Sequence, residues 1–167
     1  MKFYGLIESK LTSYKNCFEN GSVTFINLYS YMMNRKSNAD FKSFDFVGVD
    51  GIMLVLAFRA IGVKVTRLSF DFTSIANDFF LSCCSDKKSL YIVGSEQKNI
   101  ENFASKVRER YLGINIVDYR NGYFTSEEER NREFAKIISS GADYLLVGMG
   151  SPHQETFVAD LKRMGWK

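Results

Sequence analysis

The sequence is short of prolines, histidines and long apolar runs. Its 167 residues include one proline, Pro152, and one histidine, His153, which stand side by side. It has no run of about 18 apolar residues, and its amino terminus has no apolar segment behind a basic start. The sequence therefore predicts neither a membrane-spanning helix nor a signal peptide, and any membrane contact is expected to be peripheral.

Cysteine is also scarce, and charge of one sign is not in marked excess. Cys17, Cys83 and Cys84 lack the spacing of metal ligands, and an adjacent pair is poorly placed to form a disulfide with itself. This usage favours a reduced, cytoplasmic setting. The 22 basic and 19 acidic residues are spread along the chain, so we expect no nucleic-acid partner.

What the chain does have is enough apolar sequence for one core, so residues 1–167 are predicted to form a single domain. Short β-branched or aromatic runs alternate with amphipathic stretches, which is typical of βαβ units. The predicted strands are Val23–Ile26, Phe44–Val49, Val63–Leu68, Leu90–Val93, Ile114–Tyr119 and Tyr144–Val147. The predicted helices are Leu28–Arg35, Ile52–Ala60, Phe72–Cys83, Gln97–Tyr111, Glu127–Ser139 and Pro152–Met164. The predicted fold class is α/β, a mostly parallel sheet with helices on both faces.

The segment around the lone proline is the most informative. The apolar strand Tyr144–Val147 is followed by Gly148, Gly150 and then Pro152, where the chain is expected to restart as a helix. Such a turn leaves backbone N–H groups bare at the carboxyl edge of a sheet, where anionic ligands bind. Helix capping explains Pro152 and Gln154 but not the two glycines, so capping and ligand binding both stay open.

The same segment narrows the class of ligand. A dinucleotide fingerprint needs a third glycine where His153 stands, so an NAD-dependent oxidoreductase loses most of its support. Beside a diphosphate, Glu155 would repel, so a ligand-binding Glu155 is expected to face ribose or sugar hydroxyls. In the first helical turn it would also complement the helix dipole.

Polar residues follow other predicted strands. Asn27 ends the first, and Asp50 ends the next, directly before a glycine and a helix. Asp50 is explained either as a helix cap or, at the mouth of a sheet, as a general base. Arg67 is explained either by a surface ion pair with Asp71 or as a partner for a diphosphate.

Glycines close two further strands. Gly94 follows Leu90–Val93, and Gly122 and Tyr123 follow Ile114–Tyr119. Turn formation explains each glycine singly. Because a glycine or a polar residue follows nearly every strand, the sequence predicts one shared ligand cleft at this edge.

Taken in order, these residues resemble the WecG/TagA/CpsF glycosyltransferase family over almost the whole chain. The matching positions are Asn27, Asp50-Gly51, Arg67 with Asp71, Gly94, Asn121-Gly122-Tyr123-Phe124 and, most specific of all, Gly148-x-Gly-Ser-Pro-His-Gln-Glu155. The resemblance implies a Rossmann-like fold. It also implies transfer of an N-acetylmannosamine-type or related sugar from a UDP-sugar to a polyprenyl-diphosphate-linked sugar acceptor in bacterial cell-surface polymer synthesis.

The resemblance further implies roles for individual residues. Asp50 would be the general base that deprotonates the acceptor hydroxyl, and Arg67 would act in catalysis. The implied substrate-binding positions are Asn27, Asp71, Gly94, Gly122, Tyr123, Gly148, Gly150, Pro152, Gln154 and Glu155. An inverting transfer needs one base and positive or N–H-rich groups for the leaving diphosphate. No cofactor or metal is expected, and the sequence has no Asp-x-Asp pair of the kind that metal-dependent glycosyltransferases use.

Three departures from the family pattern bear on activity. Phe25 replaces a usual threonine two residues before Asn27, and the usual glycine between Arg67 and Asp71 is missing. The family's carboxyl-terminal strand and basic tail, thought to meet the membrane and supply arginines to the site, are not in this sequence. We therefore expect a truncated form of an enzyme peripheral to the inner face of the cell membrane, which binds donor, turns over poorly and tends to form a homo-oligomer.

Two classes of function remain. The first is an inverting UDP-sugar transferase, and the second is a non-catalytic nucleotide-sugar-binding or assembly subunit. Asp50→Asn separates them, because only a transferase has turnover to lose.

Overall fold

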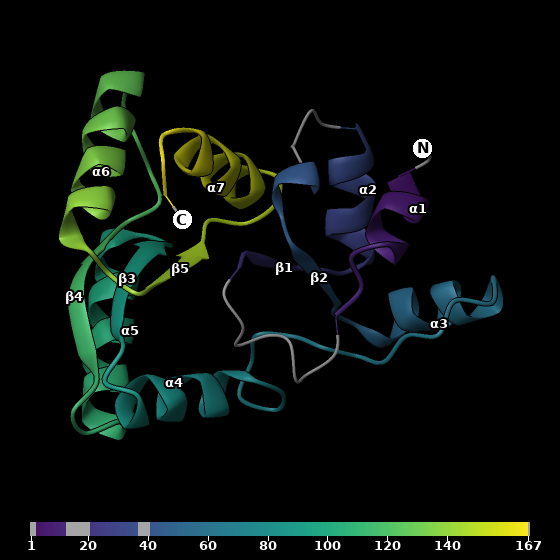
Figure 1. The fold of residues 1–167 in the computed structure, drawn as a ribbon, viewed down its shortest axis with the longest axis horizontal. Coiled ribbons are helices and arrows are strands. Elements are labelled where there is room, and N and C mark those ends of the chain that lie inside the picture. The colour runs from purple at the N-terminus through teal and green to yellow at the C-terminus, as the bar shows by residue number, and fades with distance from the viewer. Residues whose placement is uncertain (1–2, 13–20, 37–40, 167) are drawn as a thin grey trace. The chain divides into compact units, whose positions relative to one another are not determined.

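A computed structural model describes residues 3–12, 21–36 and 41–166 (Figure 1). These residues group into two compact units. Unit 1 lies within residues 1–77 and 151–159, and unit 2 comprises residues 78–150 and 160–166. We describe each unit by itself, and the single domain stays a prediction from the sequence.

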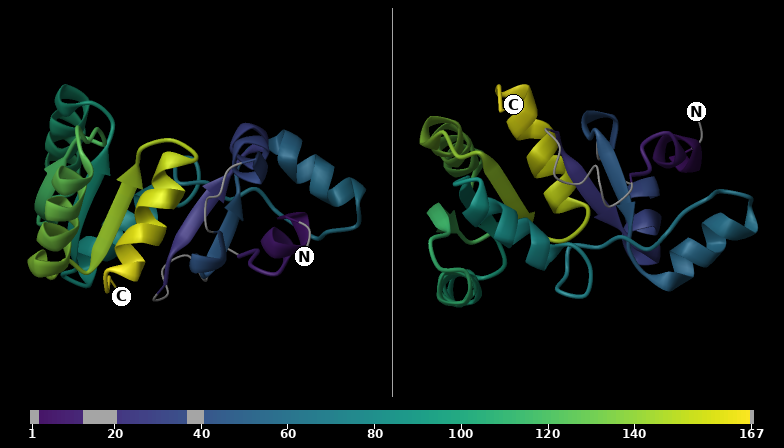
Figure 2. Two further views of the ribbon diagram at one scale, coloured as in Figure 1. Left: turned by 90° about the horizontal axis from the view of Figure 1, so that it is seen from above. Right: turned by 60° about the horizontal axis from the view of Figure 1, so that its bottom comes forward.

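Unit 1 is built around two short parallel strands (Figure 1). Its elements up to residue 60 are α1 (Phe3–Glu8), β1 (Val23–Ile26), α2 (Leu28–Lys36), the 3-10 turn η2 (Phe41–Ser43), β2 (Phe46–Val49) and α3 (Ile52–Ala60). The strands pair in parallel from Val23 with Phe46 to Ile26 with Val49, and they lie side by side in every view (Figure 2). The two strands therefore end together at one edge.

Apolar side chains from these strands and helices make the core of unit 1. Ile26 and Val49 are buried at the ends of the strands, and α3 packs Leu54, Val55 and Phe58 against them. The spacing of the three α3 side chains places them on one helical face. The core thus fixes the two strand ends together with the first turn of α3.

The predicted strand Val63–Leu68 is wrong except at its end. Only Arg67 forms a bridge, in parallel with Val49, and the Leu68 N–H donates to the Val49 carbonyl at 2.8 Å. The Val65 carbonyl accepts from Nε of Arg59 at 2.9 Å, so a side chain takes a group that a ladder would use. The segment still brings Arg67 beside the end of β2.

Unit 2 contains a three-stranded parallel sheet. Its strands are β4 (Asn115–Arg120), β3 (Ser89–Gly94) and β5 (Tyr144–Gly148), in that spatial order. Its helices are α5 (Gln97–Arg110), α6 (Glu127–Ser140), most of α4 (Ala76–Ser85) and the end of α7 (His153–Arg163). The α/β class and the parallel pairing are confirmed, with the described strands forming one small sheet in each unit.

Helices α5 and α6 pack against the sheet of unit 2. The buried Tyr91 of β3 donates its hydroxyl to Glu133 of α6 at 2.6 Å, and Nη2 of Arg108 in α5 donates to the Ile116 carbonyl at 3.0 Å. Because side chains alternate along a strand, Leu90 and Ile92 point away from the face that Tyr91 occupies. Both are buried, so the strand is covered on two sides.

Helix α4 begins at Ala76, four residues later than predicted, because the carboxylate and carbonyl of Asp71 bond the chain into a turn. The Asp71 carbonyl accepts from the Ala76 N–H at 3.1 Å.

Helix α1 was not predicted from the sequence. In α4, Cys83 is buried and Cys84 is partly exposed, both are free thiols, and burial raises the pKa of Cys83 to about 12. Cys17 lies outside the described residues.

The helices described in either unit are each too short or too polar to cross a membrane.

The close approach of Gly94 to Gly148, where β3 and β5 end, gives a stability prediction. A Cβ added to Gly94 would lie 2.3 Å from the Gly148 carbonyl oxygen, whereas a Cβ added to Gly148 would meet nothing within 4 Å. Gly94→Ala is expected to lower the free energy of unfolding by about 1–3 kcal/mol. Gly148→Ala should stay within about 0.5 kcal/mol of wild type. Urea titration of both variants checks this, and equal stabilities would contradict the close strand contact.

Candidate active site

In unit 1, the carboxyl ends of β1 and β2 bring Asn27 and Asp50 together. The Asp50 N–H donates to the Ile26 carbonyl at 2.7 Å, which fixes the two chains where their strands end. A Cβ added to Gly51 would lie 3.7 Å from the Asn27 Cβ. The sequence prediction that these residues share one edge is therefore confirmed for this pair of strands.

Asn27 itself caps α2. Its Oδ1 accepts from the Ser30 N–H at 2.9 Å, and the Ser30 hydroxyl accepts from the Asn27 N–H at 2.8 Å. This reciprocal arrangement satisfies two N–H groups at the helix start. Asn27 remains exposed, so capping holds its side chain in place at the surface.

Asp50 does not cap α3, although capping was one explanation of the sequence. The cap residue is Gly51, with φ of 81°, and no side chain bonds the helix start there. The Asp50 carboxylate instead lies 3.2 Å from Nη2 of Arg67. Both side chains are more than one-third exposed, so Asp50 stays accessible to solvent beside the arginine.

Arg67 also pairs with Asp71, as the surface-pair explanation predicts. Its Nη2 lies 2.5 Å from the Asp71 carboxylate and 2.8 Å from the Ser69 hydroxyl. The hydrogen bonds to Asp71 raise the pKa of Arg67 further, with smaller contributions from Asp50. One guanidinium thus joins two carboxylates, which come from the end of β2 and from the turn before α4.

Asp71 is the most strongly bonded carboxylate of this group. The Ser69 hydroxyl donates to its Oδ2 at 2.5 Å, and the hydroxyl and N–H of Thr73 donate to its Oδ1 at 2.6 and 2.8 Å. These bonds and the one from Arg67 hold the pKa of Asp71 well below its usual range. Ser69 and Thr73 were missed from the sequence, where their positions two residues on either side of Asp71 were the available signal.

The Ser-Pro-His-Gln-Glu segment also belongs to unit 1. Helix α7 begins at His153, and the Pro152 carbonyl accepts from the Thr156 N–H at 3.2 Å, so Pro152 precedes the helix where the sequence predicted that it would begin it. Glu155 is fully buried and contacts Thr24 of β1 through Oε1 at 3.1 Å. Strand β1 thus bonds α7 at Thr24 and the Asp50 segment at Ile26.

In unit 2, three of the predicted glycines meet at the carboxyl ends of the strands. Gly94 pairs with Gly148 across β3 and β5, and a Cβ on Gly122 would lie 3.2 Å from the Gly94 Cα. The Ser95 N–H donates to the Gly148 carbonyl, and the Gly122 N–H donates to the Ser95 carbonyl, both at 3.0 Å. The glycines let three backbone segments approach closely. Gly150 follows with φ of 76°, in open space.

Arg120 holds the loop that carries Tyr123. It donates to the carbonyls of Asn121 and Tyr123 at 3.0 and 2.9 Å, and it lies 4.2 Å from the ring centre of Phe124. It also pairs with Glu129 at 2.9 Å. Tyr123 is exposed, and its N–H donates to the Asn121 side chain. Arg120 was missed from the sequence because nothing local distinguishes it from other arginines at a strand end.

The structure thus collects the predicted residues in two groups. Unit 1 contains Asn27, Asp50, Arg67, Asp71, Pro152, Gln154 and Glu155, and unit 2 contains Gly94, Gly122, Tyr123, Gly148 and Gly150. One cleft shared by all of them stays a prediction. Among the described residues, no three His, Cys, Asp and Glu side chains gather as a metal ion would require, and metal independence also stays a prediction.

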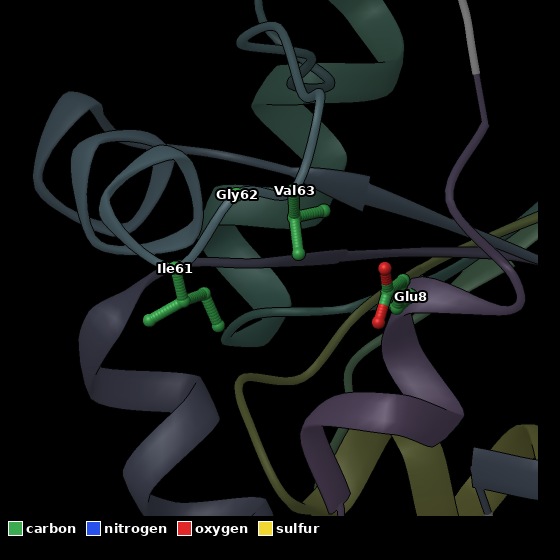
Figure 3. Close-up of a pocket in the computed structure, with 4 residues that line it drawn as sticks. All are labelled: Glu8, Ile61, Gly62 and Val63. Atoms are coloured by element: carbon green, nitrogen blue, oxygen red, sulfur yellow. The ribbon is translucent and has the colours of Figure 1, made fainter.

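A pocket in unit 1 lies apart from these residues. It is lined by Glu8, Ile61, Gly62 and Val63, as Figure 3 shows. Gly62 follows the carboxyl end of α3, whereas Asp50 precedes its amino end, and nine helical residues span about 13 Å. No candidate residue lines this pocket.

The fold and these strand-end residues define an α/β protein of parallel strands with polar side chains and glycines at their carboxyl ends. The chain belongs to the glycosyl transferase WecG/TagA/CpsF family, whose model matches residues 3–165. The family resemblance seen in the sequence is therefore confirmed.

A curated relative from Shigella boydii is similar over 143 residues, with 34% identity. It is a UDP-Gal:alpha-D-GlcNAc-diphosphoundecaprenol beta-1,4-galactosyltransferase. The match covers 85% of this chain and 60% of the relative. The match therefore spans about 60% of the length of the relative, which is less than two-thirds.

The low pKa of Asp71 predicts a pH dependence of stability. Because the folded-state pKa lies below the unfolded value, its stabilising effect is present above about pH 4 and is lost as the pH falls further. Asp71→Asn should therefore lose less stability than wild type between pH 7 and pH 3 in thermal melts. Asp86→Asn, at an exposed position, serves as the control. Parallel losses in wild type and Asp71→Asn would contradict this assignment.

Proposed function

We propose that this chain carries the catalytic core of an inverting glycosyltransferase. The donor would be a UDP-sugar and the acceptor a polyprenyl-diphosphate-linked sugar, in the synthesis of a bacterial cell-surface polymer. Family membership supports transfer of a sugar, and the substrates in the name of the S. boydii relative support this donor and acceptor class. The family resemblance favours an N-acetylmannosamine-type sugar and the relative favours galactose, so a panel of UDP-hexoses and UDP-N-acetylhexosamines is the appropriate screen.

The observation that carries the proposal is the pairing of Asp50 with Arg67. A carboxylate at a strand end that is one-third exposed and oriented by a guanidinium is accessible to an acceptor hydroxyl, as a general base must be. In the proposed reaction, Asp50 takes the proton of the acceptor hydroxyl while its oxygen bonds the anomeric carbon of the donor. The bond from that carbon to the diphosphate oxygen breaks, and UDP leaves with the electron pair.

Arg67 would orient the base. It contacts Asp50 and Asp71 together, and these two carboxylates outweigh its single charge. A diphosphate placed directly on Arg67 would meet that negative charge. We therefore propose that Arg67 acts first as the group that holds Asp50, and that any contact with the leaving diphosphate is secondary.

The surface around the end of β1 and β2 suits work on a lipid-linked acceptor. Helix α2 starts directly after Asn27 and α3 starts two residues after Asp50, and both expose apolar side chains in their first two turns. These are Leu28, Tyr29, Met32, Ile52, Met53 and Leu56. Residues 51–66 contain no acidic residue and two basic ones, Arg59 and Lys64. An apolar and basic surface is favourable at an anionic bilayer, so we propose a peripheral location on the inner face of the cell membrane.

Asp50→Asn tests the role of the base. Loss of a general base is expected to lower kcat by about 10²–10⁴-fold. UDP binding, measured by calorimetry, should be retained, because the amide keeps the size of the side chain. Asp71→Asn is the matched control, since it removes the other carboxylate on Arg67 and should lower kcat far less. Equal losses in the two variants would contradict the role of Asp50 as the base, whereas no turnover in wild type with any UDP-sugar would favour the binding subunit.

Cosedimentation with anionic vesicles tests the location. Replacing both Met53 and Leu56 by Glu should weaken vesicle binding by about tenfold or more, since each buried apolar side chain contributes about 1.5–3 kcal/mol. Leu112→Glu changes an apolar side chain that is 87% exposed in unit 2 and should have little effect. Equal binding by all three proteins would rule out the α3 surface.

A further inference from the structure

Glu155 is a buried carboxylate that collects hydrogen bonds from three parts of the chain. Its Oε1 accepts from the hydroxyl of Ser151 at 3.0 Å, from Nε2 of Gln154 at 3.1 Å and from the hydroxyl of Thr24 at 3.1 Å. The donors belong to the turn before α7, to α7 itself and to β1, which is 131 positions away in the sequence. The side chain has no exposed surface.

A fully buried carboxylate lowers the stability of the folded chain unless hydrogen bonds compensate for its lost hydration. Burying a carboxylate requires hydrogen-bond donors, and Oε2 of Glu155 is buried without a partner among the described residues. Thr24 is itself only 4% exposed, so its hydroxyl serves Glu155 and is closed to a ligand. The arrangement points to a carboxylate whose purpose is to orient its donors.

Of these three hydrogen-bond donors, Gln154 is the one that the family resemblance places in binding of the nucleotide sugar. Because Oε1 of Glu155 accepts from Nε2 of Gln154, the contact holds the nitrogen of the Gln154 amide toward Glu155. The amide oxygen then lies on the other side of the amide carbon. A carbonyl oxygen has two lone pairs and accepts from hydroxyl or N–H groups, whereas it repels phosphate oxygens.

We infer that Glu155 is a positioning residue: through Oε1 it fixes the polarity of the Gln154 amide, so that Gln154 offers an acceptor to a hydroxyl or N–H group of the nucleotide sugar and not to its diphosphate. This inference rests on the proposed function in that Gln154 contacts the donor. It replaces the direct contact between Glu155 and sugar hydroxyls that was expected from the sequence.

Donor affinity and a double-mutant cycle test this inference. Glu155→Ala and Thr24→Val should each raise the Kd for UDP-sugar, by about tenfold for Glu155→Ala. The double variant should be no weaker than Glu155→Ala alone, because Thr24 acts through Glu155. Glu155→Gln keeps an acceptor in place and should lose less than Glu155→Ala. Unchanged affinity in Thr24→Val, together with equal losses in Glu155→Gln and Glu155→Ala, would mean that the carboxylate touches the ligand itself and would overturn the inference.

A core variant separates positioning from general loss of stability. Ile137 is buried in α6 of unit 2, so Ile137→Val is a mild change in the core. Its decrease in Tm and its Kd are compared with those of Thr24→Val. Its Kd for UDP-sugar should equal that of wild type. If Ile137→Val weakened binding as much as Thr24→Val does, the effect of Thr24 would be one of stability alone.

The side-chain amide signals of Gln154 provide a readout that needs no ligand. They are assigned in a ¹⁵N-labelled sample by their disappearance in Gln154→Ala. They should shift and exchange faster with water in Glu155→Ala, and should stay in place in Ile137→Val. Unmoved signals in Glu155→Ala would overturn the inference even if the protein bound UDP-sugar. Moved signals in a protein that binds no uridine nucleotide would support the positioning and defeat the proposed function alone.

Discussion

The parallel pairing of β1 with β2 is the constraint on which the candidate site depends. Ile26 lies opposite Val49, so the residues that follow, Asn27 and Asp50, leave the ladder at the same level. The bond from the Asp50 N–H to the Ile26 carbonyl fixes that exit, and the bridge from Val49 to Arg67 brings the guanidinium to it. A shift of one position in this register would turn every side chain to the opposite face.

Charge then decides what the site can do. One guanidinium lies between Asp50 and Asp71, and the hydroxyls of Ser69 and Thr73 share the stabilisation of Asp71. Asp71 accepts hydrogen bonds from Ser69 and Thr73 in addition to its pair with Arg67, whereas the contact that the structure shows for the Asp50 carboxylate is the one with Arg67. This asymmetry between two neighbouring carboxylates is the physical basis for assigning the proton transfer to Asp50.

Local patterns predicted most of the fold and which residues follow the strands, but not the contacts between them. Val23–Ile26 and Ile52–Ala60 were predicted with the bounds observed, because β-branched runs and one apolar helical face are local signals. Val63–Leu68 has the composition of a strand, yet the side chain of Arg59 bonds the carbonyl of Val65. The burial of Glu155 could not be foreseen, because its partner Thr24 is remote in the sequence and hydroxyl donors carry no periodic signal.

The central proposal is that the Asp50 base lies beside a UDP-sugar site that includes Gln154, and an NMR titration of ¹⁵N-labelled protein with UDP tests it most directly. The account predicts saturable shifts of the backbone amides of Asn27, Asp50 and Gln154, with those around Gly62 unchanged. Saturable shifts confined to the Gly62 pocket, or none at any residue, would contradict it.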